Sequence, residues 1–353
     1  LLIILEGIRR GLLPRSPSFY ISIAVGIIGL SLALVVGHGS LVVAAYGARS
    51  FLLHFPAMFV IALALDRGDI IRIGKFLLIT SLAMTLLLVL QFFSPSTAWV
   101  NLGVGGEGSS GFSGALGFDR PAGTFSFTNG VTNFYSLCAA FLLYFWIHSQ
   151  QIQRWLLYGA TACLVLAIPL SISRALFFQT IISIGFCGVV LATRPRLLVR
   201  GIQITAVFFL SLILLSQTPF FEVASSAMQA RFERASEFEG GMENTLLDRY
   251  LGGFIRAILA SGDQPLFGYG IGMGTNAGSV MLTGESQFLI AEGEWGRLLG
   301  ELGPILGMAA IMMRVGTTVV AGIRSLKRVR HNDILPWMLF GNALLILPQG
   351  QWG

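Results

Sequence analysis

The chain has 353 residues, of which 54% are hydrophobic and only 11% are charged, and its mean hydropathy is +0.77. A soluble domain of this size needs far more charge to cover its surface, so the composition excludes that class of protein. The three cysteines, Cys138, Cys163 and Cys187, all lie inside apolar runs, and they suggest neither a disulfide framework nor a zinc site.

Apolar runs long enough to cross a bilayer recur along the chain, and they predict an all-α, polytopic transmembrane protein. The nine predicted spans cover about 18–36, 41–65, 76–93, 131–147, 155–173, 175–193, 201–216, 298–323 and 334–348. Arg49 and His54 interrupt the second of these runs. The spans are expected to form a single transmembrane domain over 1–353, truncated at both ends because Leu1–Leu5 resembles the end of a severed span.

The basic residues give these spans a direction. Lys and Arg concentrate at every second connection, as they do in the cytoplasmic connections of membrane proteins. This set holds fourteen of the 23 basic residues: Arg9, Arg10, Arg15, Arg67, Arg72, Lys75, Arg154, Arg194, Arg196, Arg200, Arg324, Lys327, Arg328 and Arg330. The net charge of +6 therefore reflects topology and not affinity for nucleic acid. The opposite, extracytoplasmic side holds two long loops, about 94–130 and 217–297.

The loop 217–297 is large and polar. It holds ten acidic residues and four arginines before Arg297, a net charge of −6. An apolar stripe predicts a helix suited to the membrane interface, formed by Phe221, Ala224, Met228, Phe232, Ala235 and Phe238. A second helix is expected from near Thr245 to Gly262, and it places Arg249 and Arg256 on one face about 10 Å apart.

The outward arginines are candidates for binding an anion, because guanidinium donors match phosphate oxygens and stay charged at any relevant pH. Arg174, at the outer mouth of a helical hairpin, is the strongest candidate, since an ionisable residue between two apolar runs is costly. Arg120 and Arg249 are further candidates. Arg231 and Arg234 lie among glutamates and are interpreted as surface ion pairs.

The glycine run Gly268–Gly274 admits two interpretations. It lacks the spacing and context of a nucleotide-binding loop. A tight turn is the favoured interpretation, and a nest of backbone amides that binds an anion is the alternative. Tyr269 lies inside the run and is a candidate for substrate binding.

Carboxylates gather around the start of the eighth span. Glu292 and Glu294 precede it, and Glu301 lies inside it. They are candidates for a general base, and the alternative is that they are solvated loop acids or partners of Arg297. Arg314 lies either inside this span or at its cytoplasmic edge, and the interpretation as an interfacial residue is favoured.

Five short motifs follow one another over residues 120–307. They are Arg120-Pro-Ala-Gly-Thr-Phe125, Ser171-Ile-Ser-Arg174, Arg249 at the head of a loop helix, Pro265-Leu-Phe-Gly-Tyr-Gly-Ile-Gly272 and Glu301-Leu-Gly-Pro-Ile-Leu-Gly307. Through them the chain resembles the O-antigen ligase and O-antigen polymerase superfamily of bacterial envelope glycan enzymes. The resemblance implies a multi-pass protein of the bacterial inner membrane whose large loop faces the periplasm.

The resemblance also implies an activity. It is the transfer or polymerisation of glycan from an undecaprenyl-diphosphate-linked donor to a glycan or lipid-linked acceptor, without a metal or other cofactor. Arg120, Arg174, Arg249 and Arg256, with Tyr269, are then expected to bind the donor.

One departure from the family pattern concerns the base. Ligases of the superfamily carry a histidine just before the eighth span, whereas this chain has none between His148 and His331. Glu292 and Glu294 occupy that region, which favours a polymerase-like or unassigned member with a catalytic carboxylate. Glu292 is preferred, because Glu294 is closer to Arg297 and more readily neutralised by it. The alternatives are a secondary transporter of a small, bicarbonate-like anion and a non-catalytic scaffold.

Overall fold

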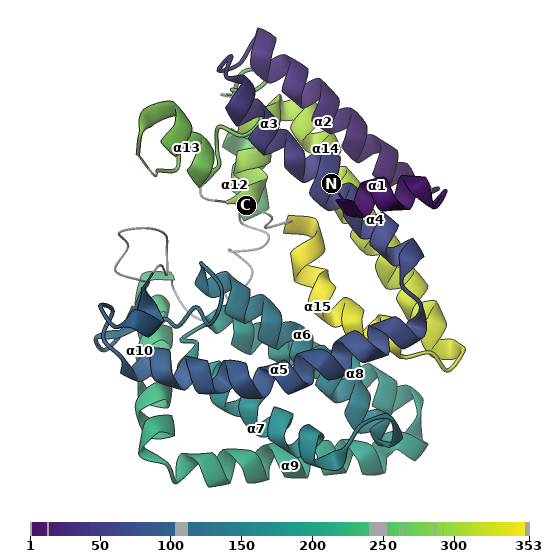
Figure 1. Cartoon of the computed structure of the whole chain (residues 1–353), viewed down its shortest axis with the longest axis vertical. Coiled ribbons are helices and arrows are strands. Elements are labelled where there is room, and N and C mark those ends of the chain that lie inside the picture. The colour runs from purple at the N-terminus through teal and green to yellow at the C-terminus, as the bar shows by residue number, and fades with distance from the viewer. Residues whose placement is uncertain are drawn as a thin grey trace. The chain divides into compact units, whose positions relative to one another are not determined.

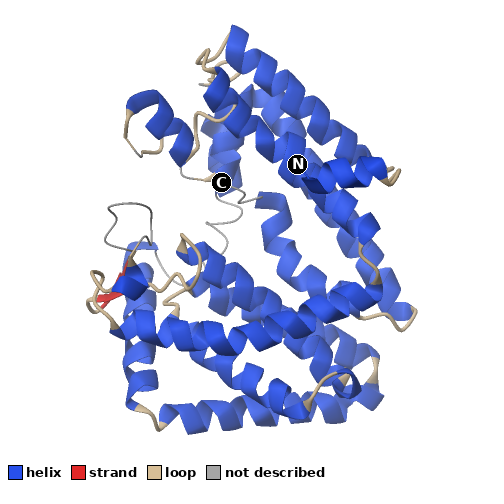
Figure 2. Ribbon diagram, viewed as in Figure 1, coloured by secondary structure: helices blue, strands red, loops and turns tan. Residues whose placement is uncertain are grey.

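The computed structural model describes residues 2–12, 14–102, 112–239, 253–260, 262, 264–285, 287–291 and 293–349. These residues are mostly α-helical, and the sheet among them is a two-stranded antiparallel pair (Figures 1 and 2). The chain divides into two compact units. The first comprises residues 1–67, 243–321 and 344–353, and the second comprises residues 68–242 and 322–343.

The elements of the first unit are α1 (Leu2–Arg9), α2 (Pro17–Val35), α3 (Leu41–Arg49), η1 (Ser50–His54), α4 (Phe55–Ala64), α12 (Gly253–Ala260), α13 (Asn276–Thr283) and most of α14 (Glu294–Arg330). Those of the second unit are α5 (Arg67–Phe93), η2 (Trp99–Asn101), β1 (Ser113–Ala115), β2 (Phe118–Asp119), α6 (Thr128–Ile147), η3 (Ser149–Gln151), α7 (Arg154–Leu170), α8 (Arg174–Thr193), η4 (Pro195–Leu197), α9 (Leu198–Ser216) and α10 (Pro219–Glu239). Helix α15 (Leu335–Gln349) contributes to both units.

The prediction of apolar, membrane-spanning helices is confirmed in its coarse form. Seven helices in the described residues are long and apolar enough to cross a membrane. Two further apolar helices, α7 and α15, coincide with predicted spans but are shorter. The total of nine spans therefore stays a prediction.

The interruption in the second predicted span is a π-helical turn, η1. Pro56 has no amide hydrogen, so it cannot donate to the Phe51 carbonyl five residues earlier. The Ser22 hydroxyl donates to that carbonyl instead, at 2.7 Å. Just before the turn, the Arg49 guanidinium lies 3.6 Å from the centre of the Tyr46 ring. The span thus continues from Leu41 to Ala64.

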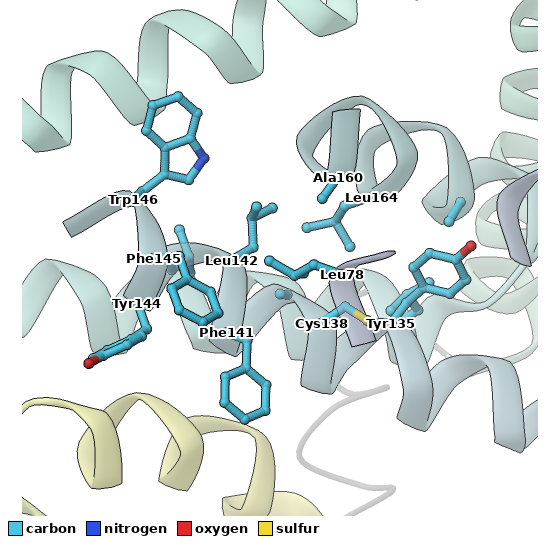
Figure 3. Packing of buried hydrophobic residues seen from close by; sticks show 14 of the residues in the cluster. Leu78, Tyr135, Cys138, Phe141, Leu142, Tyr144, Phe145, Trp146, Ala160 and Leu164 are labelled. Atoms are coloured by element: carbon cyan, nitrogen blue, oxygen red, sulfur yellow. The ribbon is translucent and has the colours of Figure 1, made fainter. Parts of the chain in front are cut away.

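Helix α6 lies at the centre of the second unit. Its residues from Cys138 to Ile147 are all buried, including Phe141, Tyr144 and Phe145. Phe141, Tyr144 and Phe145 belong to one buried cluster with Leu78 of α5 and with Ala160 and Leu164 of α7, several members of which Figure 3 shows. A helix that is buried on every side can hold its ends in fixed positions.

The predicted apolar stripe in the outward loop lies on α10, and it is described as far as Phe232, since the side chains of Ala235 and Phe238 lie outside the described part of the structure. Phe221, Ala224 and Met228 are buried. Phe232 packs edge-on against Phe177 and Phe178 of α8, with ring centres 5.6 and 6.1 Å apart. The helix itself is confirmed, and its stripe packs on protein. The second predicted loop helix ends at Ala260 in α12, while its expected start near Thr245 lies outside the described residues.

The glycine run Gly268–Gly274 packs against both α3 and α14 in the first unit. Gly268, Gly270 and Gly272 have φ of 71°, 108° and 96°, values that side chains other than glycine rarely adopt. A Cβ on Gly272 would collide with the Val43 carbonyl, and one on Gly47 would collide with Gly272 itself. The run is a tight turn whose backbone lies directly against a neighbouring helix.

Helix α14 is not one straight helix. Gly303 has φ 76° and ψ 168°, which is far from helical, and Pro304 follows it. A guanidinium nitrogen of Arg314 lies 2.7 Å from a carboxylate oxygen of Glu294. Twenty helical residues would separate these positions by about 30 Å, so the two arms must fold back on each other at Gly303. The eighth predicted span, 298–323, therefore includes a hairpin turn.

We expect Gly303→Ala to destabilise the protein markedly. At this φ and ψ a Cβ costs about 1–3 kcal/mol of backbone strain, and it would also collide with the Leu266 carbonyl. Gly316→Ala in the same helix is the control, because nothing lies within 4 Å of that position. Thermal unfolding in detergent is the measurement. Equal transition temperatures for the two variants would contradict the hairpin.

Candidate active site

The turn that precedes α8 is strained. Ile172 is buried and has φ 45°, a left-handed conformation that a β-branched residue adopts rarely and at a cost of about 1–2 kcal/mol. Ser173 fixes the turn from one side, since its hydroxyl accepts from the Leu176 amide at 3.3 Å and contacts the Thr132 hydroxyl at 2.9 Å. Ser171 fixes it from the other, donating to the Ile168 carbonyl at 2.9 Å. Strained backbone of this kind is concentrated at functional sites.

The strained turn lies beside the Arg120 segment. At Gly114, the position that a Cβ would take is 2.6 Å from Ile172 Cδ1 and 3.3 Å from Arg120 Cγ. Gly114 in β1 thus leaves room for both side chains. Arg174 follows Ile172 by two residues, so two of the predicted arginines come from adjoining segments of one unit.

Arg174 is the first residue of α8. The N-terminus of a helix carries a partial positive charge, and a basic residue there is unfavourable unless an anion is close by. Among the amides of this first turn, that of Leu176 is already capped by the Ser173 hydroxyl. Arg120 and Arg174 therefore stay candidates for binding an anion.

The first unit contains a second polar centre, a network of four ionisable side chains. Arg297 makes a two-pronged ion pair with Glu294, at 2.7 and 2.8 Å, and a third contact with Glu301 at 2.8 Å. Arg314 contacts Glu294 at 2.7 Å and also donates to the carbonyl of Gln349, the last residue of α15, at 3.0 Å. The side chains of Glu301 and Arg314 are 0% and 1% exposed. Two arginines and two glutamates balance, so the network is electrically neutral.

The interpretation of Arg314 as an interfacial residue is wrong. Its guanidinium is buried between the arms of α14, and its centre lies 5.4 Å from the centre of the Phe51 ring. Sequence reasoning offered the pairing of these glutamates with Arg297 as an alternative, but it missed Arg314, because the partner of Arg314 is twenty residues away, across a hairpin that a continuous apolar run does not reveal.

The amides of the glycine run are used within the fold. Gly270 donates to the Glu301 carbonyl at 3.0 Å, and Tyr269 donates to the Gly300 carbonyl at 2.8 Å. The Gly274 amide donates to the Glu301 carboxylate at 2.9 Å. The anion that this run meets is thus a side chain of the protein, and the interpretation as a tight turn is confirmed.

The structure says less about the other predicted site residues. Tyr269 and Arg256 are exposed in the first unit. Arg249 and Glu292 lie outside the described residues. Glu294 is ion-paired with Arg297, as expected when Glu292 was preferred as the base. No family model, curated protein or solved structure matches the chain.

We expect Arg314→Met and Glu294→Gln each to destabilise the protein, and the double variant to recover much of the loss. Each single change leaves the buried network with one unbalanced charge, and breaking a buried ion pair typically costs about 3–5 kcal/mol, whereas the double variant is neutral again. Thermal unfolding of the four forms gives the coupling energy. Arg324→Met, at an exposed position of the same helix, is the control. Additive effects would contradict a coupled pair.

Proposed function

We propose that the protein is a membrane glycosyltransferase. It takes glycan from an undecaprenyl-diphosphate-linked donor and passes it to a glycan or lipid-linked acceptor, in the manner of the O-antigen ligase and polymerase superfamily. The reaction belongs to the outer face of the bacterial inner membrane. The motifs between 120 and 307 support this family assignment, and the apolar helices are consistent with its location.

The observation that carries the proposal is the junction at Gly114. It joins the segment of Arg120 to the strained turn before Arg174, two segments separated by about fifty residues in sequence. A diphosphate needs several fixed cationic donors, and arginine supplies them in a planar fork. In the reaction these arginines stabilise the charge that develops on the leaving lipid diphosphate. Arg249, Arg256 and Tyr269 stay the further substrate-binding residues that the family resemblance implies.

The acceptor hydroxyl must lose a proton as it attacks the sugar. Glu292 is the proposed general base, because Glu294 is occupied by Arg297 and Arg314. The proton passes to the Glu292 carboxylate while the new glycosidic bond forms and the bond to the diphosphate breaks.

We expect Arg120→Lys and Arg174→Lys each to lower glycan transfer about 10- to 100-fold. Lysine keeps the charge and loses the fork, and a charge-assisted hydrogen bond contributes about 1.5–3 kcal/mol. Glu292→Gln should lower turnover by about 100- to 10,000-fold and leave donor affinity nearly unchanged. The assay is transfer from purified lipid-linked donor, with Arg154→Lys, at an exposed position, as the control.

A second candidate function is secondary transport of a small anion. Transporters place ionisable residues inside the membrane on broken helices, and Arg314 with the break at Gly303 has that character. The neutral balance of the network argues for a structural role instead. Uptake of bicarbonate by proteoliposomes that show no glycan transfer would favour the transporter and overturn the glycosyltransferase.

The proposed orientation predicts which cysteines react with a membrane-impermeant thiol reagent in cells. In a background that lacks the three native cysteines, Ser226→Cys and Asn276→Cys should react from outside, since both positions are exposed and lie in the large loop. Gln153→Cys, on the predicted cytoplasmic side, should react only after the membrane is opened. The reverse pattern would invert the topology.

A further inference from the structure

Gln91 is a buried polar residue near the end of α5. It follows the apolar run Leu86-Leu-Leu-Val-Leu90, and only 3% of its surface is exposed. A buried amide without hydrogen bonds is costly, so its partners explain why glutamine can occupy this position.

All three hydrogen bonds that the Gln91 side chain makes in the described residues go to two backbone segments. Its Oε1 accepts from the Gly123 amide at 2.7 Å, and its Nε2 donates to the Gly123 carbonyl at 3.0 Å. Nε2 also donates to the Val100 carbonyl at 2.9 Å. The side chain therefore bonds both the amide and the carbonyl of Gly123 and connects this residue to a second loop segment at Val100.

Only glycine fits at position 123, because its backbone is enclosed by neighbouring side chains. Its φ is +61°, and a Cβ there would lie 2.6 Å from the Met84 sulfur and 3.3 Å from Val131 Cγ2. The residue is thus enclosed by α5 and α6 as well as held by Gln91. Fixing Gly123 also restricts the position of the Arg120 backbone. Only two residues lie between Gly123 and Arg120, namely Pro121, with its fixed φ, and the fully buried Ala122.

The other end of this segment is fixed as well. The Arg120 amide donates to the Phe112 carbonyl at 2.8 Å. Asn101 closes the end of α5, where its Nδ2 donates to the carbonyls of Gln91, Ser94 and Pro95 at 3.1, 3.1 and 3.0 Å. The backbone of Arg120 is therefore held from both directions.

We propose that Gln91 is a positioning residue for a diphosphate site, holding the 120–123 segment so that Arg120 meets the phosphates. This inference rests on the proposed function, since it takes the lipid diphosphate as the ligand. Gln91 does not touch the ligand, and it acts through Gly123. An error of about 1 Å in the position of such a group can cost on the order of 100-fold.

The first test is binding of farnesyl diphosphate, compared with farnesyl monophosphate and inorganic pyrophosphate, to the full chain in nanodiscs. Gln91→Leu removes all three hydrogen bonds, and Gln91→Asn keeps the amide but shortens its reach. Each should weaken farnesyl diphosphate binding about 10- to 100-fold and affect the monophosphate less. Gln179→Leu is the matched control, since Gln179 is also a buried glutamine in an apolar helix of the same unit and its Oε1 has no partner in the described residues.

The second test does not depend on the ligand. Ala122→Cys, in a background without the native cysteines, should be protected from thiol reagents, because Ala122 is 0% exposed. Adding Gln91→Leu should make it reactive, and adding Gln179→Leu should not.

The outcomes separate the two proposals. A wild-type protein that does not distinguish diphosphate from monophosphate contradicts the proposed function, whatever the reactivity at 122. A wild-type protein that does distinguish them contradicts the role of Gln91 if both Gln91 variants bind as well as wild type. Equal losses in Gln179→Leu would also contradict it, because general destabilisation would then explain the effect.

Discussion

A polar group enclosed by apolar helices is costly without a partner, because no water is there to replace one. This constraint explains the main irregular features of the structure. The Ser22 hydroxyl meets the carbonyl that Pro56 leaves without a donor. Arg314 meets Glu294 across the α14 hairpin. Gln91 meets both backbone groups of Gly123. In each case a side chain on one element fixes the backbone or side chain of another.

The same constraint assigns different roles to the two polar centres. The network of Glu294, Arg297, Glu301 and Arg314 is electrically neutral, and its carboxylate oxygens are occupied by guanidinium or amide donors. Such a network holds a hairpin in place, and its carboxylates have little capacity left for a ligand, although the Arg314 Nε has no partner in the described residues. The segments of Arg120 and Arg174 adjoin each other at Gly114 and at the strained turn of Ile172. This arrangement fixes the backbone positions from which the two arginine side chains extend. This contrast is why the glycosyltransferase is preferred over the transporter.

The sequence predicts much of the fold, because hydrophobic length and periodicity are local signals. The apolar runs gave the positions of the long helices, and a three- and four-residue stripe gave α10 with the right residues facing inward. The hairpin in α14 was missed because a single glycine at φ 76° reverses the chain inside an otherwise helical pattern. Arg314 was misinterpreted for the same reason, since its partner is distant in sequence. Gln91 gave no signal beyond one polar residue at the end of an apolar run.

The central claim is that Arg120 and Arg174 bind one diphosphate. The most direct measurement is a structure of the protein in nanodiscs with a polyprenyl diphosphate bound, determined by electron cryomicroscopy. The account predicts both phosphates within hydrogen-bonding distance of the two guanidinium groups, with the glycine run still packed against α14. Phosphates bound away from either arginine, or beside Arg314 in an opened network, would contradict it.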